Sequence, residues 1–256
     1  MKSLRTFAAL FATAAATLAL PSAILIPLGL LPPTAARAAA PDPDQVATNK
    51  IRDLSGVLKV VQADFDELAK IGRDFRTTYR FKEMSLAYKN PNKTRLEARI
   101  LGAAIVLVFN GDTKMVKAPF RKEVRNIFGQ AGQKKNLLDL GVFARDYLTT
   151  DWKATYQRAD GTLQVYRLTQ RNTDSRAFEI VWVNPRTAVT EKRQSFSGTG
   201  HLRMELRYKN AVQAAPGVFI PTRIEVYNQE GKLGGVQEMR SLKVNAGVSD
   251  DKFATS

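Results

Sequence analysis

The side chains that could carry out chemistry are few in this sequence. Its 256 residues include one histidine, His201, and no cysteine. A metal site in a protein needs several His, Cys or carboxylate ligands close together, and a catalytic nucleophile needs a base beside it. His201 is expected on the polar face of a strand, next to Arg203 and Glu205, where a solvated imidazole is the simplest interpretation. We therefore expect no bound metal and no cofactor.

Two groups of carboxylates are the remaining candidates for acid–base chemistry. Asp64, Asp66 and Glu67 fall on the exposed side of a predicted helix, and Asp250 and Asp251 lie near the end of the sequence. Both groups are expected to be ordinary solvated charges. Nucleophile motifs of the type G-x-S-x-G and phosphate loops of the type G-x-x-x-x-G-K-[ST] are absent. The sequence therefore favours a binding protein over an enzyme, and a hydrolase that depends on His201 is the enzymatic alternative.

The first 40 residues have the composition of a secretory signal. Lys2 and Arg5 precede a long apolar run, and small residues follow around Ala36-Arg37-Ala38, an A-x-A pattern. We predict a cleaved signal peptide over residues 1–38, a linker over 39–49 and one domain over 50–256. The alternative, an uncleaved membrane anchor, is disfavoured because prolines interrupt the run. Without a cysteine no lipid can be attached at the cleavage site, so a soluble periplasmic protein is expected.

The charge is strongly basic, with a formal net charge of +15. A balance of this size attracts polyanions or anionic membrane surfaces in a salt-dependent way. Nucleic acid is not expected as a partner, because the signal directs the chain away from it and no recognised binding motif accompanies the charge. The alternative interpretation is that Lys and Arg simply solvate the outer faces of strands.

Hydrophobic spacing predicts a helix followed by strands. Apolar residues recur at helical spacing from Leu54 to Ile71, and Gly72 could end that helix. From Asp74 the period changes to two, which predicts a strand with Phe75, Tyr79 and Phe81 on one face. A second, short helix is predicted over residues 136–148.

Alternating segments and turn signals account for the rest of the chain. Strands are predicted over 95–100 and 104–109, and hairpins turn at Asp160-Gly161, at Asn184-Pro185 and between Asn228 and Gly231. The predicted fold class is α+β, mainly β: one strongly curved antiparallel sheet, an unclosed barrel of about 10–11 strands, with helices capping its concave apolar face.

Three passages, taken in order, resemble the LolA/LolB-like periplasmic lipoprotein carriers, the family of outer-membrane lipoprotein-sorting proteins. "KNPNKTRLE" (89–97) is similar to the K-R-P-N motif and its following strand, and "VFNGDTKMVKAPF" (108–120) is similar to a strand, turn, strand and Asn-Pro-Phe ending. "NAGVSDDKF" (245–253) resembles the closing N-x-x-V-x-x-x-K-F. The resemblance extends from about Val46 to Phe253.

This resemblance implies an unclosed barrel whose apolar interior holds the acyl chains of a lipid or lipoprotein beneath helices. The carriers have an arginine that holds their helical lid closed, whereas this sequence has Asn90 before Pro91. The resemblance therefore does not extend to this way of holding the lid closed. The expected partners are an acyl lipid or lipoprotein and either an anionic membrane surface or an envelope transporter, and a monomer is expected. The alternative function is an envelope lipid sensor or regulatory scaffold that binds a protein partner with the same fold.

Candidate site residues follow from the predicted faces of the strands. The wall of the cavity is predicted to consist of Phe75, Tyr79, Phe81, Leu96, Ile100, Ile105, Leu107, Phe109, Phe178, Ile180, Trp182, Ile224 and Val226. Contacts with lipid headgroups or the membrane are predicted for Arg76, Arg80, Arg95 and Arg99. For each wall residue the alternative is ordinary core packing.

Overall fold

The computed structural model describes residues 40–100 and 102–255, and the predicted signal peptide lies outside them. The described residues contain one antiparallel sheet of thirteen strands in the order β6-β5-β4-β3-β2-β1-β13-β12-β11-β10-β9-β8-β7. The outermost strands, β6 and β7, do not pair with each other, so the sheet is not closed. The predicted mainly β fold class with an unclosed antiparallel sheet is confirmed, but the sheet has thirteen strands instead of the predicted 10–11.

The strands are β1 (Asp53–Ala63), β2 (Glu83–Lys89), β3 (Lys93–Ile100), β4 (Ala103–Asn110), β5 (Thr113–Ala118), β6 (Arg121–Asn126), β7 (Trp152–Asp160), β8 (Leu163–Gln170), β9 (Phe178–Asn184), β10 (Val189–Phe196), β11 (Leu202–Ala215), β12 (Val218–Asn228) and β13 (Leu233–Val244). The α-helices are α1 (Pro43–Val46), α2 (Phe65–Ile71), α3 (Arg73–Thr78) and α4 (Arg145–Thr150), and the 3-10 helices are η1 (Ala131–Gln133), η2 (Leu137–Leu140) and η3 (Asp250–Phe253).

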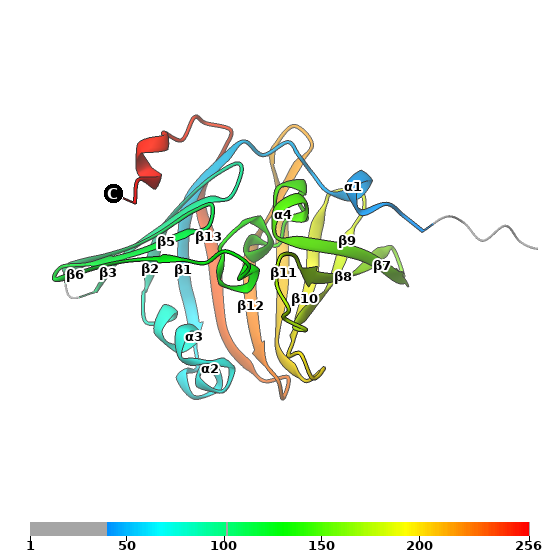
Figure 1. Cartoon of the computed structure of the whole chain (residues 1–256), viewed down its shortest axis with the longest axis horizontal. Coiled ribbons are helices and arrows are strands. Elements are labelled where there is room, and N and C mark those ends of the chain that lie inside the picture. The colour runs from blue at the N-terminus through cyan, green and yellow to red at the C-terminus, as the bar shows by residue number, and fades with distance from the viewer. Residues whose placement is uncertain (1–39, 101, 256) are drawn as a thin grey trace, which may run out of the picture. The chain divides into compact units, whose positions relative to one another are not determined.

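Two excursions of the chain cover one face of the sheet, which we term the helix-covered face. The first, between β1 and β2, holds α2 and α3. The second carries η1, η2 and α4 from β6 to β7, and because these strands are opposite edges of the sheet it must cross a whole face. Figure 1 shows α4 in front of the strands and α2 and α3 near one end of β1. One apolar cluster joins both excursions to the sheet.

The outer face carries a smaller apolar cluster near the end of the chain. Val106, Val108 and Met115 project from β4 and β5 on this face, and Phe253 of η3 packs against them. The two faces of β4 are therefore both apolar, as the sequence "AIVLVF" predicts. Each face of this strand has its own cover.

The predicted hairpins are confirmed. β7 and β8, β9 and β10, and β12 and β13 pair as antiparallel neighbours around the turns expected from Asp160-Gly161, Asn184-Pro185 and the segment from Asn228. In β12, Ile224 and Val226 are buried in the main cluster, as their alternation with polar residues predicts.

The predicted helix from Leu54 to Ile71 is wrong over most of its length. Residues Asp53–Ala63 form β1, which pairs with both β2 and β13, and only Phe65–Ile71 is helical. Leu54 and Leu58 both point into the core. A spacing of four residues satisfies a strand as well as a helix, because four is an even number, so the pattern could not separate the two.

The predicted strand from Asp74 is also wrong. Residues Arg73–Thr78 form α3, and the chain then turns so that Tyr79 and Phe81 enter the core. The predicted helix over residues 136–148 is broken at Gly141 into η2 and α4. Gly141 has φ 74°, a left-handed conformation that favours glycine, and a Cβ there would lie 2.5 Å from the ring of Tyr208. Both the backbone conformation and the close packing therefore require glycine at this position.

Candidate functional site

Residues 64–82, with α2 and α3, form a lid over the ends of β12 and β13. Asp64 caps α2 by accepting hydrogen bonds from the backbone N–H groups of Asp66 and Glu67. Leu68 is fully buried, and its side chain rests on Gly234 of β13. A Cβ at Gly235 would lie 2.3 Å from the ring of Tyr79. The lid therefore seats closely because β13 has two glycines beneath it.

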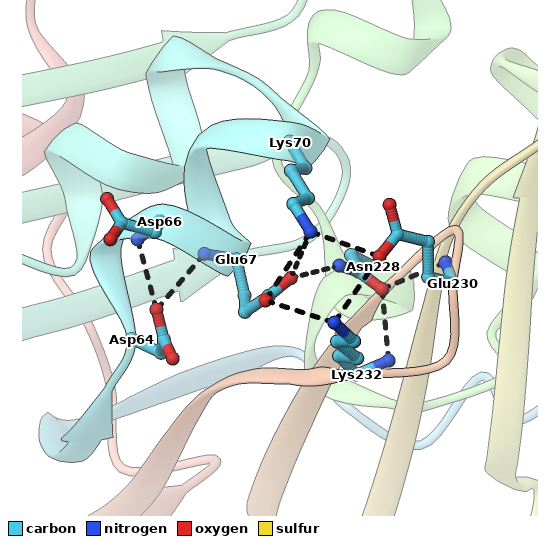
Figure 2. Close-up of polar contacts among 7 residues, drawn as sticks. All are labelled: Asp64, Asp66, Glu67, Lys70, Asn228, Glu230 and Lys232. Atoms are coloured by element: carbon cyan, nitrogen blue, oxygen red, sulfur yellow. Dashed lines mark hydrogen bonds and ion pairs between the residues drawn. The ribbon is translucent and has the colours of Figure 1, made fainter.

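A group of polar contacts, which we term the latch, fastens the lid to the β12–β13 turn (Figure 2). The side-chain amide of Asn228 donates to the Glu67 carboxylate, and Lys70 Nζ lies 3.0 Å from Glu230 Oε2 and 3.1 Å from Glu67 Oε2. Asn228 also accepts from the backbone N–H groups of Glu230 and Lys232, which shapes the turn. The Glu230 carboxylate raises the pKa of Lys70, and Lys70 lowers the pKa of Glu230.

Next to the lid, the helix-covered face of β3, β4 and β5 presents apolar side chains that are only half-buried, which we term the apolar strip. Its members are Leu96, Ile100, Ile105, Leu107 and Val116. Leu107 is the register partner of both Leu96 and Val116, so one row runs across three strands. Leu96, Ile100 and Ile105 also pack against the buried cluster. The strip therefore continues the buried surface beneath the lid.

A central cover, residues 127–151 with η1, η2 and α4, lies on the same face and is held differently. Leu137, Leu138, Phe143 and Tyr147 are almost fully buried. Phe143 stacks on Tyr166 of β8 with 5.1 Å between ring centroids. These side chains make the central cover part of the core.

A buried ionic network fixes η2 of the central cover to the sheet. Arg193 of β10 donates to Glu179 Oε2 at 3.0 Å and to Asp139 Oδ1 of η2 at 3.1 Å. Burial by itself lowers the pKa of Arg193, but the two carboxylates outweigh it and raise that pKa well above its ordinary value. Tyr208 adds a hydrogen bond of 3.0 Å to the backbone carbonyl of Leu138. The network ties three distant parts of the chain together.

Five buried side-chain polar atoms have no hydrogen-bond partner among the described residues. Two of them, the hydroxyl of Tyr79 and the side-chain amide nitrogen of Gln237, are donors on the lid and on the strand β13 beneath it. The ring of Tyr79 packs against Gly235, two positions before Gln237 on β13. Burial raises the pKa of Tyr79 well above its ordinary value, so the hydroxyl keeps its proton. Buried polar groups are nearly always satisfied, so two unpaired donors near one glycine indicate a place for a polar ligand group.

The structure places most predicted wall residues on the helix-covered face. Phe75 belongs to α3 of the lid, Tyr79 and Phe81 to its last residues, and Ile224 and Val226 to β12 beneath it. Leu96, Ile100, Ile105 and Leu107 form the strip described above. Phe109 follows them on β4, opposite Thr94, whose hydroxyl donates to the carbonyl of Lys135 next to the central cover's η2. The sheet thus brings these residues to one face.

The placement of Phe178, Ile180 and Trp182 on the same wall is wrong. In β9 it is Val181 and Val183 that belong to the main cluster, so the three predicted residues point to the outer face. Arg167 lies 3.6 Å from the Phe178 ring centroid, and Lys192 lies 3.7 Å from that of Trp182. The sequence "FEIVWVN" is apolar at nearly every position after Glu179, so alternation could not identify the buried side.

Three of the four arginines predicted to contact headgroups or the membrane are exposed, and the fourth is engaged in other contacts. Arg76 and Arg80 are exposed on the lid, and Arg99 is exposed on β3. Arg95 points to the outer face, where it bonds to Glu97 and to the backbone carbonyl of Lys252. Arg95 is therefore engaged in holding η3, whereas the other three make no ion pair with any residue that the structure describes.

The expectation of ordinary solvated carboxylates is wrong for three of them. Asp64 is a helix cap, Glu67 belongs to the latch, and Asp250 bridges Lys89 at 2.6 Å and Lys93 at 2.7 Å. Hydrogen bonds from these lysines lower the pKa of Asp250 to about 2. The D-x-x-E spacing of Asp64 and Glu67 is a helix-start signal that could have revealed the cap. No local signal indicates the partners of Glu67 or Asp250.

Within residues 40–100 and 102–255 no group of three or more His, Asp or Glu side chains could hold a metal ion. His201 is exposed and its ring contacts Thr199. None of the helices in this part of the chain is both long and apolar enough to span a membrane. Asn90, at the position where the resemblance expects a latching arginine, uses its backbone N–H to bond to Arg52.

Comparison with known proteins shows the fold. Searches with protein-family models and against curated proteins give no match. Among solved structures, an outer membrane lipoprotein-sorting protein domain from Vibrio parahaemolyticus is 11% identical and superposes with a TM-score of 0.55, over 82% of this chain and 92% of that one. A LolA superfamily protein from Nitrosomonas europaea is 17% identical, with a TM-score of 0.51 over 82% and 93% of the two chains. The predicted resemblance is confirmed in its fold.

Proposed function

We propose that this chain, which has the LolA-like fold, is a periplasmic carrier that binds the acyl chains of a lipid or lipoprotein beneath its lid in outer-membrane lipoprotein or lipid trafficking. The observation that carries the proposal is the apolar strip, which extends the buried surface of the lid onto β3, β4 and β5. Half-exposed apolar rows of this kind mark surfaces that a ligand or partner covers.

An acyl chain beneath the lid would have to displace it, because Leu68 and Tyr79 pack directly on Gly234 and Gly235 of β13. Pockets of about 320 Å³ beside Trp182 and about 430 Å³ beside Asn90 are lined by residues outside the lid and the strip. An acyl chain that lies along the strip gains about 0.8 kcal/mol for each methylene it buries.

The unpaired groups beneath the lid suit the polar end of an acyl lipid. An ester or amide carbonyl accepts hydrogen bonds, and both the Tyr79 hydroxyl and the Gln237 amide nitrogen are donors. A carbonyl held at this point would leave its acyl chain free to extend along the strip. Arg76, Arg80 and Arg99 are free to meet an anionic headgroup, an anionic membrane or an envelope transporter. This role needs binding groups only, no catalytic residue and no cofactor, and it suits a monomer.

The experiment is native mass spectrometry, with lipid extraction, on the protein purified without detergent from the periplasm. We expect an acyl lipid or lipoprotein at one copy per chain. Leu107→Asp places a charge in the strip and should abolish the adduct. Val212→Asp, at an exposed valine on β11, is the matched control and should retain it.

A second variant tests the polar end of the site. Tyr79→Phe removes an unpaired buried hydroxyl, so it should stabilise the unliganded protein by about 1 kcal/mol while weakening lipid retention. A purely structural tyrosine would not separate these two readouts. If the wild type carries no lipid and takes up no fluorescent fatty acid, the carrier role is wrong, and the sensor or scaffold that binds a protein partner becomes the better proposal.

A further inference from the structure

Among the described residues, the most exposed of the large apolar side chains lies at the tip of the β5–β6 hairpin. Phe120 lies in the turn between β5 and β6 with a relative exposure of 102%. Val124 of β6 and Phe128, which follows β6, are also exposed, with relative exposures of 50% and 59%. A phenylalanine with no contact contributes nothing to folding, so its place at a tip needs another explanation.

The same hairpin concentrates positive charge. From Thr113 to Phe128 the sequence has five basic side chains and one acidic side chain. The acid, Glu123, pairs with Arg121 and Arg125. Among the described residues Lys117 and Lys122 have no ion-pair partner, and both are exposed. The hairpin is therefore a cationic surface around an apolar tip.

The register of the hairpin sets like charges directly opposite each other. Lys117 faces Lys122, and Lys114 faces Arg125. Alternation along β5 sends the first pair to one face of the sheet and the second pair to the other. Like charges opposite each other on neighbouring strands destabilise a sheet. Glu123 compensates Arg125, whereas Lys117 and Lys122 have no anion beside them among the described residues, so an external anion would relieve their repulsion.

The location of the tip matches that of the lid. Strands β1 to β6 are antiparallel neighbours, so the β3–β4 and β5–β6 turns lie at the end of the strands at which β1 leads into the lid. Arg76 and Arg80 of the lid and Arg99 near the end of β3 are exposed at this same end. Figure 1 shows β3 to β6 reaching to the left of the view, beyond the helices. The tip therefore lies at the same end of the strands as the lid and its exposed arginines.

We propose that the β5–β6 hairpin is a membrane-docking site that places Phe120 at the headgroup level of an anionic bilayer, with Lys117 and Lys122 on anionic lipid headgroups. An added strand from a protein partner fits less well, because β6 is six residues long and lined with Arg and Lys, features that protect a sheet edge from pairing. Aromatic rings and lysines favour the membrane interface.

The proposed function supplies only the biological reason for docking, since a carrier must meet the membrane that it loads from or delivers to. Docking is measured without any lipid entering the protein. Failure of docking would leave lipid binding intact, and failure of lipid binding would leave docking intact.

The test is co-sedimentation of the protein with vesicles of phosphatidylcholine and phosphatidylglycerol in a 7:3 ratio by moles, a composition chosen by analogy with anionic bilayers. We expect binding that weakens as salt rises, and about tenfold weaker binding of Phe120→Ser. Val212→Ser, at an exposed valine of another hairpin, should bind like the wild type. The double variant Lys117→Gln/Lys122→Gln should bind vesicles about tenfold or more weakly. Its control, Arg203→Gln/Lys243→Gln, makes an equal change in charge at exposed positions of β11 and β13 and should lose much less vesicle affinity.

A tryptophan placed at the tip gives an independent readout. In Phe120→Trp the new indole should shift its emission to the blue on vesicle addition and be quenched by brominated lipid, while Trp152 and Trp182 are buried and should not respond. The proposal is overturned if Phe120→Ser binds vesicles as well as Val212→Ser does. It is also overturned if the Lys117→Gln/Lys122→Gln variant and the Arg203→Gln/Lys243→Gln variant lose the same affinity, which would indicate attraction by net charge alone. Absence of vesicle binding by the wild type, with or without dimerisation through β6, would also overturn it.

Discussion

The lid and the central cover lie on the same face of the same sheet, yet different interactions hold them to it. The central cover is held by side chains with almost no exposure, such as Leu138 and Phe143, and by a buried ionic network through Arg193. The lid buries Leu68 and Ile71 of α2 together with Tyr79 and Phe81, but Phe65 of α2 is 40% exposed. In its latch the charged side chains of Lys70, Glu230 and Lys232 lie at the surface, whereas Asn228 is buried.

This difference indicates which cover can open. Segments that open locally have fewer buried apolar contacts and solvent-exposed polar contacts, whereas breaking a buried ion pair is strongly destabilising because it leaves an uncompensated charge. The lid has fewer buried side chains than the central cover and part of its latch is exposed, whereas the ionic network of the central cover is buried. A ligand on the helix-covered face should therefore enter beneath α2 and α3 and leave η2 and α4 in place.

The largest effect is expected at Arg193. Arg193→Met would leave the buried Glu179 without a cation and Asp139 with only Lys135, 3.6 Å away, and we expect a loss of about 3–5 kcal/mol in the free energy of unfolding. Urea unfolding followed by circular dichroism measures this loss. Arg203→Met, at an exposed position of β11, is the control and should change stability by less than about 0.5 kcal/mol. A loss of less than about 1 kcal/mol at Arg193 would mean that the central cover does not depend on the network.

A matched pair of glycines separates the two covers. Gly141→Ala forces a left-handed residue into the ring of Tyr208, and we expect global destabilisation of about 3 kcal/mol. Gly235→Ala presses instead on Tyr79 of the lid, so we expect faster hydrogen exchange in residues 65–78 with a smaller change in the global unfolding free energy. Equal global losses from both variants would contradict the distinction between the covers.

The latch should have a smaller and local effect. Glu67→Ala removes the acceptor of the Asn228 amide and one partner of Lys70, which we expect to contribute about 1 kcal/mol to lid closure. Hydrogen exchange in residues 65–78 should then rise about fivefold, while exchange in residues 137–148 stays unchanged. Asp66→Ala is the control on the same helix, because Figure 2 shows the Asp66 side chain directed away from the latch. The same acceleration in both variants would mean that helix stability, rather than the latch, controls the lid.

The smallest effect concerns the end of the chain. The lowered pKa of Asp250 means that its pairing with Lys89 and Lys93 is present above the ordinary pKa range of an aspartate and is lost as the pH falls through about 2. Asp250→Asn should therefore be slightly less stable than the wild type at pH 6, and the difference should vanish near pH 2. Urea unfolding at several pH values measures it. A difference that persists at pH 2 would assign the effect to something other than the ion pairs.

The sequence by itself determined β3 and β4, the β7–β8, β9–β10 and β12–β13 hairpins with their turns, and the fold class, but it did not reveal β6. These features follow from local rules, because alternation over six residues and a turn at Asp160-Gly161 need no knowledge of distant parts of the chain. The same rules failed in the segment that forms β1 and the lid. There Leu54 and Leu58 fit both periods, and short helices such as α3 owe their stability to packing rather than to propensity.

Only the tertiary structure decided which face of each strand is buried and how the covers are held. Val181 rather than Trp182 points inward because η2 and α4 cross that side of β9, which no property of the strand itself reveals. The latch joins Glu67 to Asn228 across 161 positions, and the network joins Asp139 to Arg193 across 54. Hydrophobic alternation and turn residues are local and remain visible in a sequence, whereas an ion pair depends on two distant side chains that only folding brings within 3 to 4 Å, roughly the range of direct contact.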